Sequence, residues 1–167
     1  MSDSWRLLWL MILLMFMVPA QVLLIPQFVS PVFLPHLGIV GAFLFGWLAG
    51  EGVGVVVGLI LGLLFDRFTA GTVGLHMLIL PCVGVAAGLV RRLLPEPTFP
   101  HRLGILFVFV LAAEGASLTL FALTGSVTLD GWLIVHQLLP GLLADMVLGG
   151  LVLALAAGLG GARRALV

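Results

Sequence analysis

Glu114 and Asp145 are the residues whose chemistry most needs an explanation, because each interrupts a long apolar run of the sequence. A carboxylate at the centre of a membrane span costs about 3 kcal/mol or more. We therefore expect both side chains to face the interior of a helix bundle or a partner protein, with His76 and His136 as possible neighbours. Two explanations stay open: hydrogen bonding between helices, or a role in moving protons or binding a ligand.

Gln21, Asp66 and Arg67 are further polar residues within or beside apolar runs. The Gln21 amide can hydrogen-bond to a neighbouring helix, or it can lie at the level of the lipid headgroups. Asp66 and Arg67 are adjacent, so on a helix their side chains point about 100° apart and need not pair with each other. Asp66 can cap the helix that follows, since Asp is a strong capping residue; alternatively, it pairs with an arginine or a backbone amide of a partner.

Glycines stand on both sides of this pair, and five of them are candidates for close packing: Gly54, Gly58, Gly62, Gly71 and Gly74. The first three recur at every fourth position, which places them on one face of a helix. A face without side chains lets another backbone approach closely. The partner of this face is either another helix of the same chain or a different membrane protein.

Motifs of membrane enzymes are absent from the sequence. There is no Gly-x-Ser-Gly element of rhomboid-like proteases, no His-Glu-x-x-His zinc motif and no lysine to end a phosphate-binding loop. The four histidines are scattered, and the single cysteine, Cys82, is expected to be buried and cannot form a disulfide within the chain. We predict a non-catalytic protein with no cofactor and no metal site, and the lack of a basic patch argues against nucleic-acid binding.

The composition indicates an all-α membrane protein. The 167-residue chain is 62% hydrophobic and 8% charged, whereas soluble domains carry about 25% charged residues. Residues 37–65 are too long for one span at 1.5 Å per residue, so Gly50, Glu51 and Gly52 are predicted to form a tight turn. We predict a single transmembrane domain, residues 1–167, with short loops and six spans at about residues 7–25, 34–49, 53–65, 70–92, 103–123 and 132–159.

The placement of arginine predicts the orientation in the membrane. With six spans, both termini lie on one side, and six of the seven arginines share that side: Arg6, Arg91, Arg92, Arg102, Arg163 and Arg164. Cytoplasmic loops are enriched in basic residues. Both termini are therefore predicted to be cytoplasmic, and Arg67 alone lies on the outer side.

The segment around Asp66 has a distinct pattern: Gly62, three apolar residues, the aspartate, a short break, and then Gly-Thr-Val-Gly-Leu at residues 71–75. This pattern resembles the MreD family of rod-shape-determining proteins. The chain length, the short loops and the hydropathy along the whole chain are similar as well. Two positions depart from the family pattern, since Ala70 stands where glycine is frequent and Arg67 where an apolar residue is usual.

The resemblance implies a six-helix fold similar to the substrate-binding S components of energy-coupling-factor vitamin transporters. It also implies a multi-pass protein of the bacterial inner membrane that belongs to the cell-elongation machinery. Such a protein binds an MreC-like single-pass protein and works with RodA, a class B penicillin-binding protein and, indirectly, the MreB cytoskeleton. The predicted function is a non-catalytic scaffold that supports lateral peptidoglycan synthesis.

Two other functions are compatible with the polar residues inside the apolar runs. An S-component-like subunit would bind a vitamin-sized molecule in a pocket lined by Glu114, Asp145 and His76. An S component should carry a stripe of small residues on its first helix, and the first predicted span has only Ala20. A channel or proton-coupled transporter would depend on Glu114 and Asp145 alone.

Overall fold

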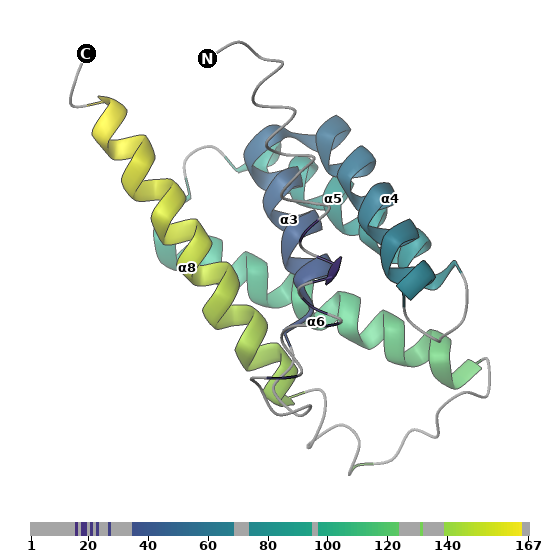
Figure 1. The fold of residues 1–167 in the computed structure, drawn as a ribbon. Helices are drawn as coiled ribbons and strands as arrows, with labels where there is room; N and C mark the ends of the chain where they lie inside the picture. The colour runs from purple at the N-terminus through teal and green to yellow at the C-terminus, as the bar shows by residue number, and fades with distance from the viewer. Residues whose placement is uncertain are drawn as a thin grey trace.

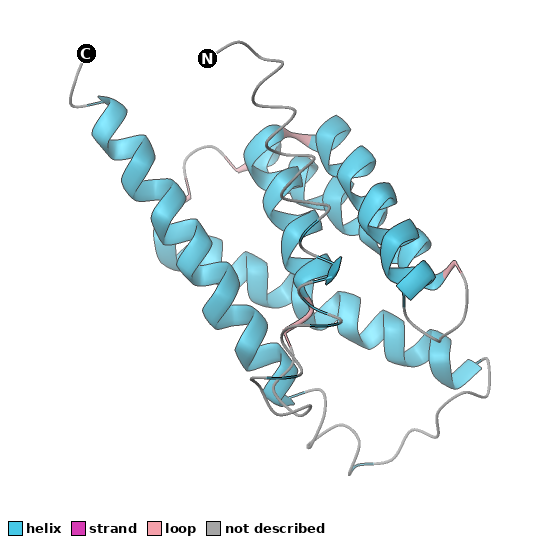
Figure 2. Ribbon diagram, in the orientation of Figure 1, coloured by secondary structure: helices cyan, strands magenta, loops and turns pink. Residues whose placement is uncertain are grey.

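The computed structural model describes residues 16, 18, 19, 21, 23, 27, 35–68, 74–94, 97–123, 131 and 139–164, without the side chains of residues 155–164. Helices and short connections make up this part of the chain, and no strand occurs in it (Figure 2). The all-α prediction is confirmed for these residues. Five helices are defined: α3 (Leu37–Ala49), α4 (Glu51–Phe68), α5 (Leu75–Leu93), α6 (Phe99–Leu123) and α8 (Leu139–Arg164).

A turn between the second and third predicted spans is present, but it consists of Gly50 alone, because Glu51 and Gly52 belong to the next helix. Helix α3 ends at Ala49, Gly50 adopts a φ of 95°, and α4 begins at Glu51. A positive φ of this size is open to glycine and strained for other residues, so Gly50 reverses the chain within one residue. Helix α4 continues to Phe68, three residues beyond the predicted end at residue 65, and it therefore includes Asp66 and Arg67.

The glycine face of α4 packs against α5 of the same chain, and the two helices lie side by side (Figure 1). A Cβ atom on Gly58 would lie 2.6 Å from the backbone of Leu80, and one on Gly62 would lie 2.6 Å from the backbone of Met77. Gly54 faces the backbone of Gly84 in the same way. The two backbones touch, so this glycine stripe is occupied within the chain and is not open to a partner protein.

Gly84 is the point where three helices meet. Its backbone is the nearest neighbour of Gly46 on α3 as well as of Gly54 on α4. Gly88, one turn further along α5, faces the backbone of Gly50 and Glu51. The glycines of α3, α4 and α5 therefore hold these three helices together as one compact unit.

Helices α6 and α8 differ from the predicted spans at their ends. Helix α6 begins at Phe99, four residues before the predicted start, so Pro100 lies in its first turn. Proline is tolerated there because the first amides of a helix have no partner within the helix. Helix α8 is described from Leu139 and continues to Arg164, five residues past the predicted end.

The core lies between α3, α4, α5 and α6, where the fully buried side chains include Phe43, Leu61, Leu80 and Leu106. Cys82 is exposed, so the prediction that it is buried was wrong. The side chains of residues two positions apart on a helix, such as Leu80 and Cys82, point about 200° apart. Because Leu80 faces the core, Cys82 necessarily faces outward.

Two helices, Leu75–Leu93 and Phe99–Leu123, are long and apolar enough to cross a membrane. Leu37–Ala49 and Leu139–Ala154 are shorter apolar helices. Helix α4 has 18 residues but carries Glu51, Asp66 and Arg67 at its ends. The predicted span at residues 7–25 lies largely outside the described residues, as do residues 132–138 of the last predicted span.

Candidate functional site

His36, Glu114 and Asp145 come together from three separate parts of the chain. The Nδ1 atom of His36 lies 2.6 Å from Oε1 of Glu114 and 3.7 Å from Oδ2 of Asp145. The His36 backbone N–H donates a hydrogen bond of 2.6 Å to Oδ1 of Asp145. Glu114 is 7% exposed and Asp145 is fully buried. Both carboxylates face the interior, as the sequence predicts for charges in apolar segments.

Helix periodicity explains why the two carboxylates point inward. Glu114 follows buried Val110 by four residues on α6, and Asp145 follows buried Leu142 by three residues on α8. Residues three or four positions apart share a helix face. His36 directly precedes α3 and makes no side-chain cap to it, so its imidazole is free to turn toward α6.

This His36–Glu114–Asp145 cluster lacks the hydrogen bonds that buried polar atoms need. Nδ1 of His36 and Oε1 of Glu114 form an ion pair when the imidazole is protonated, but neither atom has a hydrogen-bond partner in the described structure. The same is true of Oδ2 of Asp145. An unsatisfied buried acceptor costs about 1–3 kcal/mol, and more when it is charged. An arrangement with three such atoms at one point needs a ligand, a proton or water.

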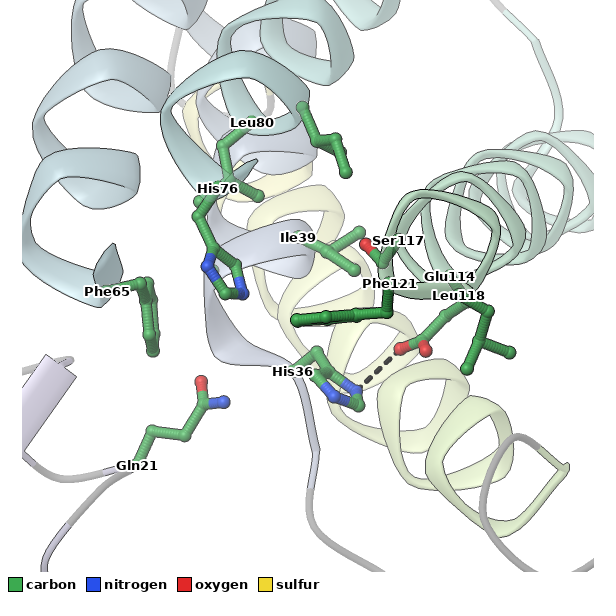
Figure 3. A pocket seen from close by; sticks show the side chains of 12 residues that line it. Gln21, His36, Ile39, Phe65, His76, Leu80, Glu114, Ser117, Leu118 and Phe121 are labelled. Carbon is green, nitrogen blue, oxygen red and sulfur yellow. Dashed lines mark ion pairs between the residues drawn. The ribbon is translucent and has the colours of Figure 1, made fainter. Parts of the chain in front are cut away.

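A cavity of about 170 Å³ adjoins the cluster. Its polar lining comes from Gln21, His36, His76, Glu114 and Ser117, and aromatic rings of Phe65 and Phe121 stand between them (Figure 3). The Oε1 atom of Gln21 is buried without a hydrogen-bond partner. The amide oxygen of Gln21 therefore faces the interior, but it makes no hydrogen bond to a neighbouring helix among the described residues.

Asp66 forms a second polar site, at the junction of α4 and α5. Its Oδ2 atom accepts hydrogen bonds from the backbone N–H groups of Gly74 at 2.9 Å and Met77 at 3.0 Å. Its Oδ1 atom accepts from the backbone N–H of His76 at 3.0 Å and from Nδ1–H of the same residue at 2.9 Å. The first turn of a helix has amides without partners. Asp66 thus caps α5 from the end of the preceding helix.

The Asp66 carboxyl lies one residue beyond the predicted span of residues 53–65. Burial acts to raise its pKa, but hydrogen bonds from the Met77 amide, the His76 side chain and the His76 amide outweigh burial. Together they hold the pKa below its ordinary value of 3.8. The group is therefore an ionised acceptor at neutral pH.

The remaining predicted residues divide into three groups. Gly74 has a φ of 97° directly before α5, and any other residue at this position would be strained. Arg67 is exposed at the end of α4. Gly71 and His136 lie outside the described residues.

The predicted neighbour of the buried carboxylates needs a correction. The ring of His76 binds Asp66, whereas His36 contacts Glu114 and Asp145. His36 is a site residue that the sequence does not predict. The available signal was that two carboxylates in apolar runs require a partner, but nothing in the spacing of four scattered histidines selects His36.

Comparisons with known protein families, with curated proteins and with solved structures found no match to this chain.

Proposed function

We propose that this chain is a multi-pass protein of the bacterial inner membrane that acts as an MreD-like, non-catalytic scaffold of the cell-elongation complex. In this proposal it crosses the membrane six times with both termini in the cytoplasm. It binds an MreC-like single-pass protein and supports lateral peptidoglycan synthesis by RodA and a class B penicillin-binding protein. The MreB cytoskeleton is connected to it indirectly.

The observation that carries this proposal is the unit formed by the residues of the resemblance. Gly62 lets α4 touch the backbone of α5 at His76 and Met77. One turn later, Asp66 accepts the amide hydrogens of Gly74, His76 and Met77. The spacing of the motif thus has a physical reason, because the glycine and the aspartate fix the same helix start from two directions. A pattern with such a reason is a stronger basis for a family resemblance than hydropathy alone.

The alternating direction of α3, α4 and α5 supports the proposed topology. Arg92 at the end of α5 lies 3.4 Å from Glu51 at the start of α4, and Arg91 donates to the carbonyl of Trp47 near the end of α3. Asp66 and His76 join the opposite ends of α4 and α5. The two arginines and the Asp66 turn are therefore at opposite ends of the unit, as the orientation derived from arginine placement requires.

The faces open to a partner or to lipid are the apolar ones turned away from the glycine contact. On α4 these side chains are Val53, Val56, Leu59 and Leu63, and on α8 they are Leu139, Leu143, Val147 and Leu151. Each set repeats at three- or four-residue spacing, so each forms a stripe along its helix. Contiguous exposed apolar surface of this kind is typical of contact with a membrane or with another protein.

Photo-crosslinking in the native membrane tests the scaffold proposal. A photoreactive amino acid at Leu63 or Val147, both exposed, is expected to capture an MreC-like protein from one or both helices, whereas the same amino acid at buried Leu61 is the matched control. Captured proteins are identified by mass spectrometry after purification in mild detergent. Recovery of no MreC-like partner, together with normal cell shape after depletion of the chain, would overturn the proposal.

A second function, binding of a small molecule by an S-component-like subunit, is favoured by the cavity. Glu114 and His76 line it, as that hypothesis requires, but Asp145 contacts His36 behind it. About 170 Å³ accommodates only a small molecule. A co-purified organic compound that raises the melting temperature of the protein, and no longer does so in the variant Ser117→Leu, would favour this function over the scaffold.

A further inference from the structure

The His36–Glu114–Asp145 cluster has two buried carboxylates but only one group, the His36 imidazole, that balances them when it is protonated. The described arginines near polar groups are engaged elsewhere: Arg91 with the carbonyl of Trp47, Arg92 with Glu51, and Arg102 with the carbonyl of Pro97. Charged groups at membrane depth are almost always paired with one another, with backbone groups or with an ion. One of the two carboxylates is therefore left without a balancing charge among the described residues, and a bound cation would supply it.

The free atoms of the cluster converge on one point. One imidazole nitrogen and one oxygen from each carboxylate lie within 4.8 Å of one another. In the same three side chains, the atoms without a hydrogen-bond partner in the described structure are Nδ1 of His36, Oε1 of Glu114 and Oδ2 of Asp145. Two of them belong to side chains that are more than nine-tenths buried. Two carboxylate oxygens and one imidazole nitrogen this close together match the donor set of a transition-metal site.

We propose that His36, Glu114 and Asp145 bind one divalent first-row transition-metal ion, of the class of Zn²⁺ or Mn²⁺. Imidazole nitrogen suits zinc, and carboxylate oxygen suits manganese as well as zinc. Ligand atoms about 2.1 Å from a shared ion lie roughly 3–4 Å apart. The separations of 2.6 and 3.7 Å in the cluster need shifts of only a few tenths of an ångström to reach this range.

The surroundings of the three ligands fit an ion with open coordination positions. The His36 backbone N–H holds Oδ1 of Asp145, which fixes the carboxylate and leaves Oδ2 for the ion. Partners of this kind orient ligands in known metal sites. The adjoining cavity of about 170 Å³ has room for several water molecules at about 30 Å³ each. The His36 side chain is 42% exposed, which provides a route for the ion from the surface.

Metal binding by the full-length chain tests this proposal independently of any role in cell elongation. The protein is purified in detergent through a tag without histidine, stripped with a chelator, and titrated separately with Zn²⁺ and with Mn²⁺. Calorimetry measures the number of ions bound, and electron paramagnetic resonance measures the loss of free Mn²⁺ signal. We expect one ion per chain from at least one of the two metals and a rise in melting temperature with it.

Matched variants assign the site. Glu114→Gln and Asp145→Asn remove one ligand charge each with little change of shape, and both are expected to abolish binding. Glu51→Gln removes a half-exposed carboxylate, and His101→Ala removes an exposed imidazole; both variants are expected to bind as the parent protein does. If a carboxylate variant does not fold, His36→Ala takes its place, because this half-exposed residue lies outside the helices.

Three results would overturn the metal site. The first is that the parent protein binds neither ion. The second is that binding persists in the folded cluster variants or is lost in the two controls. The third is that methylammonium raises the melting temperature and the metal ions do not, since this result would assign the cluster to an organic cation.

Discussion

Asp66 and the pair Glu114 and Asp145 are carboxylates in the same apolar chain, but their surroundings are opposite. Both oxygens of Asp66 accept hydrogen bonds, and all the donors belong to the start of α5. In the other pair, one oxygen of each carboxylate is buried without a hydrogen-bond partner in the described structure. The first arrangement is complete by itself, so its role is to hold two helices together. The second is incomplete, and an incomplete buried polar group is a reason to look for a ligand.

The largest effect is expected at the glycine contact between α4 and α5, which lies next to Asp66. Gly58→Leu or Gly62→Leu places a side chain where a Cβ atom alone would lie 2.6 Å from the α5 backbone. Backbone cannot move aside as a flexible side chain can, so we expect a loss of about 3 kcal/mol or more of stability. The measurement is the yield of monodisperse protein in detergent and its melting temperature.

Leu59→Ala is the control for these glycine variants, because Leu59 lies on the exposed face of the same helix. It is expected to behave like the parent protein in both measurements. Equal yield and equal melting temperature for all three variants would contradict the close contact between α4 and α5.

Removing the Asp66 cap has the next largest expected effect. Asp66→Ala leaves the amides of Gly74, His76 and Met77 without their acceptor, which is expected to cost about 2–3 kcal/mol of stability. Asp66→Asn keeps one acceptor oxygen and should cost about half as much. Thermal unfolding in detergent measures both, and an unchanged melting temperature for Asp66→Ala would show that the cap contributes nothing.

The same site predicts a dependence on pH. The pKa of Asp66 is lower in the folded protein than its ordinary value of 3.8, so the folded state favours the ionised form. The resulting stabilisation is fully present above pH 5 and is lost as pH falls below about 4 toward the folded pKa. The difference in melting temperature between the parent protein and Asp66→Asn should therefore shrink as the pH is lowered from 6 to 3. A constant difference over this range would contradict the lowered pKa.

Distance along the chain decides how much of each site the sequence predicts. The partners of Asp66 lie 8, 10 and 11 residues away, and capping by an aspartate beside a turn is a local rule. The turn at Gly50 and the glycine face of α4 are local patterns as well, and they were also predicted. His36 and Asp145 are 109 residues apart and meet only because α6 and α8 pack beside the start of α3. No spacing rule connects them, so periodicity predicted that the carboxylates face inward but not what they face.

The smallest expected effect is a gain in stability, whereas the variants above lose stability. It directly tests whether the buried carboxylates differ from Asp66. In metal-free protein, Glu114→Gln removes one of two buried carboxylate charges that share a single imidazole, and Asp145 remains to pair with His36. We therefore expect stability to be unchanged or to rise by up to about 1 kcal/mol. Glu51→Gln is the control, because it removes an exposed ion pair with Arg92 at 3.4 Å. It should change stability by less than about 0.5 kcal/mol and shows how much the loss of one carboxylate charge matters outside the cluster. If Glu114→Gln instead destabilises the protein as much as Asp66→Asn does, then His36 and Glu114 form a self-sufficient ion pair, and the two sites are structural in the same way.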